Sequence, residues 1–131
     1  MKFKPGDTAS VTKTITQDDI EKFAELSGDR NSIHLDQDYA KGTRFHGCIA
    51  HGMLTSSLIS NVIGNELPGL GSIYLSQNLK FVAPVFPGDT ITARATVTSV
   101  RPDKPIVTLE TVCVNQRGET VVTGEAVVLV E

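Results

Sequence analysis

Residues 52–64 read GMLTSSLISNVIG, and this stretch decides the fold class. Its apolar side chains spread around most of a helical circumference rather than along one stripe, and they are Met53, Leu54, Leu58, Ile59, Val62 and Ile63. A helix that is apolar all round is typical of a buried helix. Its polar members are small, as a close neighbour would require. The sequence therefore predicts a central helix enclosed by the rest of the chain.

The chain after this helix shows the two-residue period of β-strands. Apolar residues from 73 to 85 share one face of a long predicted strand, and aliphatic residues alternate with threonines from 90 to 98. Strand-like segments follow at 106–115 and after residue 118, and the turn sequences FPGD, RPDKP and QRG separate the strands. Turn signals at this spacing indicate an antiparallel meander.

The first half of the chain is predicted to be mostly helical. A strand over residues 8–14 precedes a helix that begins after the N-cap Thr16 and ends at Gly28, and residues 36–41 form a further helical turn. A buried helix beside a curved antiparallel sheet implies that the sheet wraps around the helix. We therefore expect an α+β protein with the hot-dog fold, formed by residues 1–131 as a single domain.

The composition excludes several classes of function. The 131 residues include 40% hydrophobic and 21% charged side chains with a net charge of −3, which is ordinary for a soluble globular protein. No basic run indicates nucleic acid or a membrane surface as a partner. The N-terminus lacks the apolar segment of a secretory signal, and no apolar stretch is long enough to span a membrane. Because Cys48 and Cys113 form no disulfide framework, we expect a cytoplasmic protein.

The sequence SGDRNSIH, residues 27–34, contains the first half of a candidate site. After the helix stop, residues 29–34 are expected to form a tight loop in which Asp29 and His34 can converge. The dipole at the end of the helix disfavours negative charge on Asp29, a direction that suits a general base. The alternative is an ordinary polar turn, in which Asp29 and Asn31 bond to the backbone. The residues alone leave both interpretations open.

The second half of the site is the start of the buried helix at Gly52. Free N–H groups at a helix start bind negative charge, and a glycine lets a substrate oxygen approach the backbone. The alternative is that Gly52 only lets the chain enter a crowded core. The nearby sequence HGCIAH offers His46, Cys48 and His51, but its spacing matches no zinc motif, so no metal is predicted. Cys48 is interpreted as a small buried hydrophobe.

The sequence SGDRNSIH followed by HGM resembles the hydratase-2 motif of the MaoC-like hot-dog family. The likeness continues through HGMLTSSLIS, LPGLGSIYLSQNLKF, PVFPGD, DKPIVTL and VVTGEAVV, and so covers nearly the whole chain. The overall pattern is similar to the short (R)-specific enoyl-CoA hydratases, hydro-lyases that connect fatty acid β-oxidation to polyhydroxyalkanoate biosynthesis. Two positions depart from the pattern: Ser32 replaces a proline, and Arg30 stands where the family often has an apolar or aromatic residue.

The resemblance implies reversible addition of water to a trans-2-enoyl-CoA, giving the (R)-3-hydroxyacyl-CoA. Asp29 and His34 would hold the water, with Asp29 as base, and the Gly52 N–H would bind the thioester oxygen. Ser60 matches a serine that helps anchor the family's active site, although it also fits as a small residue packed against the sheet. Asn31 is expected to brace the loop. The family implies no cofactor, an acyl-CoA thioester as substrate, and a homodimer.

Three other functions stay open at this stage. The same fold and residues suit a 3-hydroxyacyl-carrier-protein dehydratase of fatty acid synthesis. A non-catalytic acyl-CoA-binding module is expected to lack Asp29 or His34, and both are present. A hot-dog thioesterase normally has a carboxylate on the central helix, and residues 52–64 have none. No glycine-rich phosphate loop identifies residues that contact the CoA phosphates.

Overall fold

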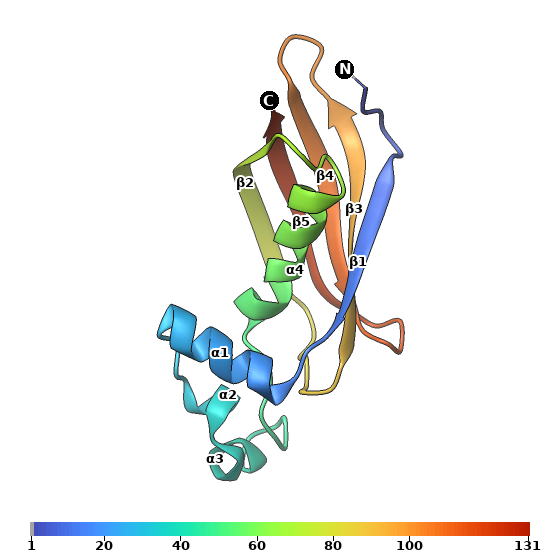
Figure 1. Cartoon of the computed structure of the whole chain (residues 1–131). Helices are drawn as coiled ribbons and strands as arrows, with labels where there is room; N and C mark the ends of the chain where they lie inside the picture. The colour runs from blue at the N-terminus through green and yellow to red at the C-terminus, as the bar shows by residue number, and fades with distance from the viewer. Residues whose placement is uncertain (1) are drawn as a thin grey trace.

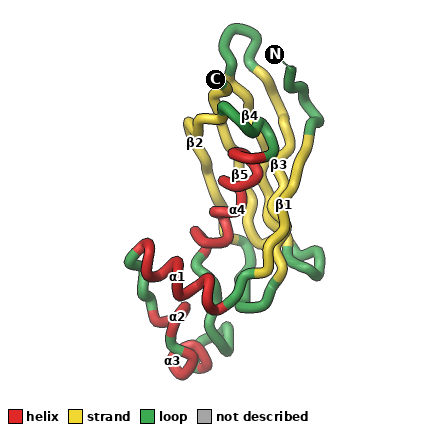
Figure 2. The backbone as a smooth tube through the Cα atoms, viewed as in Figure 1, coloured by secondary structure: helices red, strands yellow, loops and turns green. Residues whose placement is uncertain are grey.

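A computed structural model describes residues 2–131 (Figures 1 and 2). Five strands and four helices follow one another in the order β1 (Thr8–Thr14), α1 (Gln17–Ser27), α2 (Ser32–Leu35), α3 (Gln37–Lys41), α4 (Gly52–Asn65), β2 (Ser72–Phe81), β3 (Thr90–Val100), β4 (Ile106–Val114) and β5 (Thr120–Val130). The predicted strand at 8–14 and the helical turn within 36–41 are both confirmed. Among the described residues, no helix has the length and apolar composition that a membrane span requires.

The strands form one antiparallel sheet in the order β1-β3-β4-β5-β2. The predicted meander is confirmed for β3, β4 and β5, which pair with their sequence neighbours. β2 differs, because it crosses to the far side of the sheet and pairs with β5 instead of β3. The two edges of the sheet are therefore β1 and β2, as Figure 1 shows.

Helix α4 lies along one face of the sheet and contacts all five strands (Figure 1). The threonine–aliphatic alternation of β3 places Ile91, Ala93, Ala95 and Val97 against this helix, each at most 1% exposed. From the helix side, the same core contains Ile59, Val62 and Ile63 of α4. The sheet wraps the helix as predicted, and the hot-dog fold is confirmed.

Helix α4 is not buried all round, which corrects one prediction. Thr55, Leu58, Ile59, Val62 and Ile63 are among its buried residues, but a second face is exposed to solvent. The exposed face carries Met53, Ser57, Ser60, Asn61 and Gly64. These residues recur at helical spacing, so they form one continuous stripe. Three small residues of the helix, Ser57, Ser60 and Gly64, therefore lie on a face that no element within residues 2–131 covers.

Strand β2 also differs from its prediction. It ends at Phe81, so Ala83 and Val85 lie beyond it. Leu79 packs against the core as predicted, but three other apolar residues of β2 are exposed: Ile73, Leu75 and Phe81 are 46%, 51% and 52% exposed. A two-residue apolar period is the same for a core strand and for an edge strand whose face lacks a cover, so the sequence could not distinguish the two.

Candidate active site

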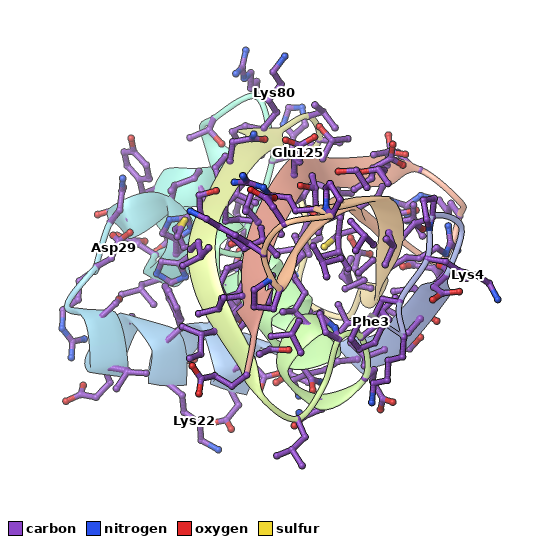
Figure 3. All side chains as sticks on the ribbon, turned by 90° about the horizontal axis from the view of Figure 1, so that it is seen from above. Phe3, Lys4, Lys22, Asp29, Lys80 and Glu125 are labelled. Carbon is purple, nitrogen blue, oxygen red and sulfur yellow. The ribbon has the colours of Figure 1, made fainter. Side chains whose placement is uncertain are left out.

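Helices α1, α2 and α3 lie beyond the end of the sheet (Figure 1), and the candidate site begins where α1 ends. It begins at a capping box, in which the Thr16 side chain accepts from the Asp19 N–H and the Asp19 carboxylate accepts from the Thr16 N–H. It ends at Gly28, whose left-handed φ of 82° reverses the chain as predicted. Figure 3 shows Asp29 directly after this reversal, on the flank where α1 lies.

The segment after Gly28 is only partly a loop, which corrects the prediction for residues 29–34. Ser32–Leu35 form the short helix α2, and the Asn31 side chain caps it by accepting from the Ile33 N–H at 3.3 Å. Ser32 is thus the first helical residue, where a backbone N–H lacks a helical partner and proline is favoured. Asn31 supplies the cap for this turn, so the helix forms with serine in place of the proline.

Asp29 is exposed, and the backbone orients its carboxylate. Its Oδ1 accepts from the Asn31 N–H at 3.2 Å, and the structure gives Oδ2 no hydrogen bond within residues 2–131. The neighbouring Arg30 forms an ion pair with Glu25 of α1. Arg30 therefore ties the loop to α1.

His34 is 9% exposed and has a fixed tautomer. Its Nδ1 lies 2.7 Å from the carbonyl oxygen of Ile49. Because a carbonyl oxygen only accepts, Nδ1 carries the hydrogen and Nε2 carries the lone pair. Burial lowers the pKa of His34, the neighbouring His51 acts in the same direction, and the Ile49 carbonyl and Asp29 oppose the shift. The neutral imidazole thus presents an acceptor nitrogen.

His51 joins the two halves of the site. Its ring stacks on His34 with 3.9 Å between ring centroids, and Phe23 of α1 packs against it at 4.8 Å. Its Nε2 donates to the backbone carbonyl of Asp29 at 2.9 Å. A carboxylate oxygen of Asp29 and one ring nitrogen of each histidine consequently lie within 4.8 Å of one another. The predicted convergence of Asp29 and His34 is present.

Gly52 is the first residue of α4, and within residues 2–131 no side chain caps the start of this helix. The first N–H groups of α4 are therefore free to bind a ligand. Packing also bears on the choice of glycine at this position. A Cβ at this position would lie 2.6 Å from the ring of Phe81. Close packing against Phe81 therefore favours glycine here, and the approach of a substrate oxygen to the Gly52 backbone stays a prediction.

A cavity of about 400 Å³ adjoins His34 and Gly52. Its wall is mostly apolar, and it includes Phe45, Ile49, Ala50, Met53, Thr55, Phe81, Val85, Val121 and Val122. Asp29 stands beside His34 but does not line this cavity. Its few polar side chains are those of His34, Arg44 and Thr55. A mostly apolar pocket with few polar groups is typical of a small-molecule site.

Ser60 is not brought to this cavity within one chain. It lies on the exposed face of α4, eight residues after Gly52, which is about 12 Å along a helix. Its packing against the sheet, the alternative interpretation, is wrong because the residue faces solvent. Its role as an active-site residue stays a prediction.

Comparison with known proteins identifies the family. The sequence profile of the MaoC like domain matches residues 4–122, which is most of the chain. The chain belongs to the MaoC-like domain family. An (R)-specific enoyl-CoA hydratase of Rhodospirillum rubrum is 51% identical over 127 residues, covering 97% of this chain and 88% of that protein. A mitochondrial 3-hydroxyacyl-carrier-protein dehydratase of Solanum lycopersicum is 37% identical, covering 94% and 74%.

Solved structures agree with this MaoC-like assignment. The (R)-hydratase of Aeromonas caviae involved in polyhydroxyalkanoate biosynthesis superposes with a TM-score of 0.96 at 47% identity. The match covers 99% of this chain and 98% of that one. The resemblance noted in the sequence is therefore confirmed at the level of family and fold.

In this MaoC-like chain, sequence reasoning missed three residues of the site. His51 was named in the HGM motif and as a possible metal ligand but was given no role in the reaction, although its place directly before Gly52 was a usable signal. Phe81 was assigned to the core face of a strand, and Thr55 was not singled out. The structure places Phe81 and Thr55 in the cavity wall and His51 against His34.

The arrangement of the possible ligand atoms bears on the alternative of a metal site. Within residues 2–131, the one group of three close ligand atoms is Asp29, His34 and His51, so His46 and Cys48 do not join His51. The two rings of that group are stacked at 26°, and ring lone pairs lie in the ring planes. Stacked rings do not aim both lone pairs at one ion. Cys48 is 2% exposed, as expected of a buried hydrophobe, and burial raises the pKa of its thiol.

Proposed function

We propose that this protein is an (R)-specific enoyl-CoA hydratase, which adds water reversibly to trans-2-enoyl-CoA. The observation that carries the proposal is the convergence of the Asp29 carboxylate and the neutral His34 imidazole within 4.8 Å. This pair stands beside an apolar cavity with free N–H groups at its mouth. The 51% identical hydratase of Rhodospirillum rubrum carries this activity in its name.

The spacing of Asp29 and His34 suits one bridging water. A water that donates to two acceptors through hydrogen bonds of about 2.8 Å spans about 4.5 Å between them. Asp29 offers a carboxylate oxygen, and His34 offers Nε2 because its Nδ1–H is engaged by Ile49. Both hydrogens of the water are thus held, and its oxygen lone pair is directed at the substrate.

Hydration then follows with a balanced proton count. The water oxygen bonds to C3 of the enoyl group as Asp29 takes one proton, and the double-bond electrons move onto the thioester oxygen. The enolate collapses and C2 receives the proton that Asp29 held, so the enzyme is unchanged. Acid–base assistance of this kind contributes roughly 10²–10⁴-fold in rate.

The Gly52 N–H is proposed to bind the thioester oxygen as negative charge develops on it. One such donor contributes about 10²–10³-fold in kcat. The free start of a 14-residue helix supplies this donor and a favourable dipole. Asn31 supports the reaction by fixing both α2 and the Asp29 carboxylate. Ser60, on the exposed face of α4, is proposed as an additional active-site residue.

The runner-up is a 3-hydroxyacyl-carrier-protein dehydratase, which shares the fold and reverses the same chemistry. The carrier-protein dehydratase of Solanum lycopersicum is 37% identical, against 51% for the CoA hydratase, which favours the CoA substrate. The product of the favoured activity, an (R)-3-hydroxyacyl-CoA, suits the polyhydroxyalkanoate biosynthesis named for the Aeromonas caviae protein. No cofactor is proposed, because the addition of water as written above uses neither a redox group nor a metal.

The test compares crotonyl-CoA, octenoyl-CoA and the matching carrier-protein thioesters. We expect the ultraviolet absorbance of the enoyl thioester to fall with crotonyl-CoA, and chiral analysis to find the (R)-alcohol. A higher kcat/KM on carrier-protein thioesters would favour the dehydratase. Binding of acyl-CoA with no turnover on any of these thioesters would support the non-catalytic module instead.

We also propose that two copies pair through β2. This edge strand presents unpaired backbone groups and the exposed apolar side chains of Ile73, Tyr74 and Leu75. Exposed hydrophobic edges of this kind are prone to pair with another strand. The exposed stripe of α4 carries mostly small residues, which would let a second copy approach. The proposal is a homodimer with the two sheets joined edge to edge.

Residues 1–131 are proposed to act as one MaoC-like domain in the cytoplasm. The five strands and α4 share a single core. Cys48 and Cys113 are both free and buried, a form that a reducing compartment maintains.

A further inference from the structure

Thr55 is a buried polar residue that the mechanism above does not use. It lies three residues after Gly52 in α4, is 1% exposed, and belongs to the wall of the same cavity as His34 and Gly52. Its hydroxyl oxygen has no hydrogen-bond partner within the described part of the chain. Buried hydroxyls are paired in the large majority of cases, so this one calls for a partner.

The local backbone does not provide that partner. Helical threonines and serines commonly donate to a carbonyl three or four residues earlier. Ser56 and Ser57 do so, donating to the carbonyls of Met53 and Leu54. The Thr55 hydroxyl differs from those of its two neighbours, because it makes no such bond within residues 2–131, and Thr55 belongs to the wall of the cavity.

Helix geometry directs this hydroxyl toward the start of α4. Side chains on a helix lean toward its N-terminus, so the Thr55 side chain covers the turn that contains Gly52. The Gly52 N–H is free at that end of the same cavity. A ligand atom held by the Gly52 N–H is therefore within the region that Thr55 faces.

We propose that Thr55 is a further substrate-contacting residue, whose hydroxyl donates a hydrogen bond to the thioester oxygen beside the Gly52 N–H. The inference rests on the proposed hydratase function. The acyl part of an enoyl thioester contains one hydrogen-bonding atom, the carbonyl oxygen, so a donor in the acyl cavity has one acceptor to bind. The bond strengthens as charge moves onto this oxygen, and Thr55 thus stabilises the transition state more than the bound substrate.

The test uses Thr55→Val, which removes the hydroxyl at nearly constant volume, and Thr55→Ser, which retains it. We expect kcat for crotonyl-CoA to fall about 10²-fold in Thr55→Val with little change in KM, the lower end for one such donor. Thr55→Ser should recover most of kcat. Thermal unfolding of Thr55→Val should match or exceed the wild type, because an unpaired buried hydroxyl is removed.

A matched control is Thr111→Val, which also removes a buried threonine hydroxyl. Thr111 lies outside the cavity, and its hydroxyl accepts from Gln77 Nε2 at 2.9 Å. This variant should lose stability and keep the wild-type kcat. Infrared spectra of bound butyryl-CoA, which cannot be hydrated, give a second readout. The carbonyl stretch should shift less from its solution value in Thr55→Val than in the wild type.

Each other outcome overturns the inference. A wild-type kcat and a wild-type carbonyl stretch in Thr55→Val would show that Thr55 does not bind the thioester oxygen. Equal losses in Thr55→Val and Thr55→Ser with lowered unfolding temperatures would indicate a packing role. A KM that rises in Thr55→Val only for (R)-3-hydroxybutyryl-CoA would show that Thr55 binds the 3-hydroxyl group of that compound instead of the thioester oxygen. A wild type that hydrates no enoyl thioester would refute the proposed function and this inference together, whereas an active wild type separates the two.

Discussion

The ring of His51 stacks on that of His34 at 3.9 Å, while its Nε2 donates to the backbone carbonyl of Asp29. One side chain thus contacts both members of the proposed catalytic pair. It comes from the residue directly before α4, so the position of the helix start and the position of the pair are linked. The oxyanion donor and the water-binding groups consequently share one rigid support.

Replacement of His51 by Phe tests this link. A phenyl ring preserves the stack on His34 but cannot donate to Asp29. We expect kcat to fall about tenfold, equivalent to about 1.4 kcal/mol, because the Asp29 loop loses its anchor. Steady-state kinetics with crotonyl-CoA measures the loss. His46→Asn, which changes an exposed histidine, is the control and should leave kcat unaltered; a wild-type kcat in His51→Phe would refute the positioning role.

The lowered pKa of His34 predicts a pH dependence for activity. Protonation of Nε2 removes the acceptor that holds the water, so kcat/KM should fall on the acid side. Because burial lowers the pKa of His34, the midpoint of this acid limb should lie below 6.5. A midpoint above 6.5 that is absent from His34 variants would contradict the neutral-imidazole mechanism.

The same shift predicts a pH dependence for stability. The unfolded chain binds a proton to this histidine near pH 6.5, whereas the folded chain resists protonation to lower pH. The contribution of neutral His34 is therefore fully present above pH 6.5 and is lost as the pH falls through the folded pKa. Urea unfolding from pH 7.5 to 5 should show a stability loss that is smaller in His34→Ala.

Gly52→Ala tests the packing of the helix start against Phe81. The added Cβ would lie 2.6 Å from the ring, so the ring or the helix start must shift. Overpacking of this kind costs about 1–3 kcal/mol. We expect reduced unfolding free energy and reduced kcat, both largely restored in Gly52→Ala/Phe81→Ala. If the double variant had the same unfolding free energy and kcat as Gly52→Ala, the contact with Phe81 would not be the cause of the loss.

Leu75→Lys tests pairing through β2. A charge on the exposed apolar edge disfavours strand pairing, so sedimentation should find a monomer where the wild type is a dimer. Leu26→Lys is the matched control, because Leu26 is 86% exposed on α1, away from β2, and should leave the dimer intact. A Leu75→Lys variant that sediments as the wild type does would rule out this edge as the interface.

Much of the fold followed from periodicity. The alternation in β3 and the stop at Gly28 were read correctly because each reflects a local requirement of the backbone. The apolar face of β2 was wrongly predicted to be buried throughout. The period of a strand is the same whether or not another element covers its apolar face. The exposed stripe of α4 escaped notice for the same reason, since Ser57, Ser60 and Gly64 suit a closely packed face as well as a solvent-facing one.

The site was predicted only in part. Asp29, His34 and Gly52 stood out by residue type and spacing near chain reversals. The roles of His51 and Thr55 depend on contacts with residues distant in sequence, namely the backbone of Asp29 and the cavity wall. A threonine in an apolar helix gives no sequence signal that its hydroxyl lacks a partner. Such contacts become visible only when the fold brings the segments together.

The central claim is that Asp29 and His34 activate water for addition to an enoyl thioester. The most direct measurement follows the absorbance of crotonyl-CoA with Asp29→Asn, His34→Ala and the control Asp38→Asn, an exposed aspartate of α3. We predict that the first two variants lose about 10²–10⁴-fold in kcat and that the control stays active. Asp29→Asn, at an exposed position, should keep the wild-type unfolding temperature, whereas His34→Ala should stay folded with a lower one because it removes a buried ring. Wild-type rates in both Asp29→Asn and His34→Ala would contradict the account.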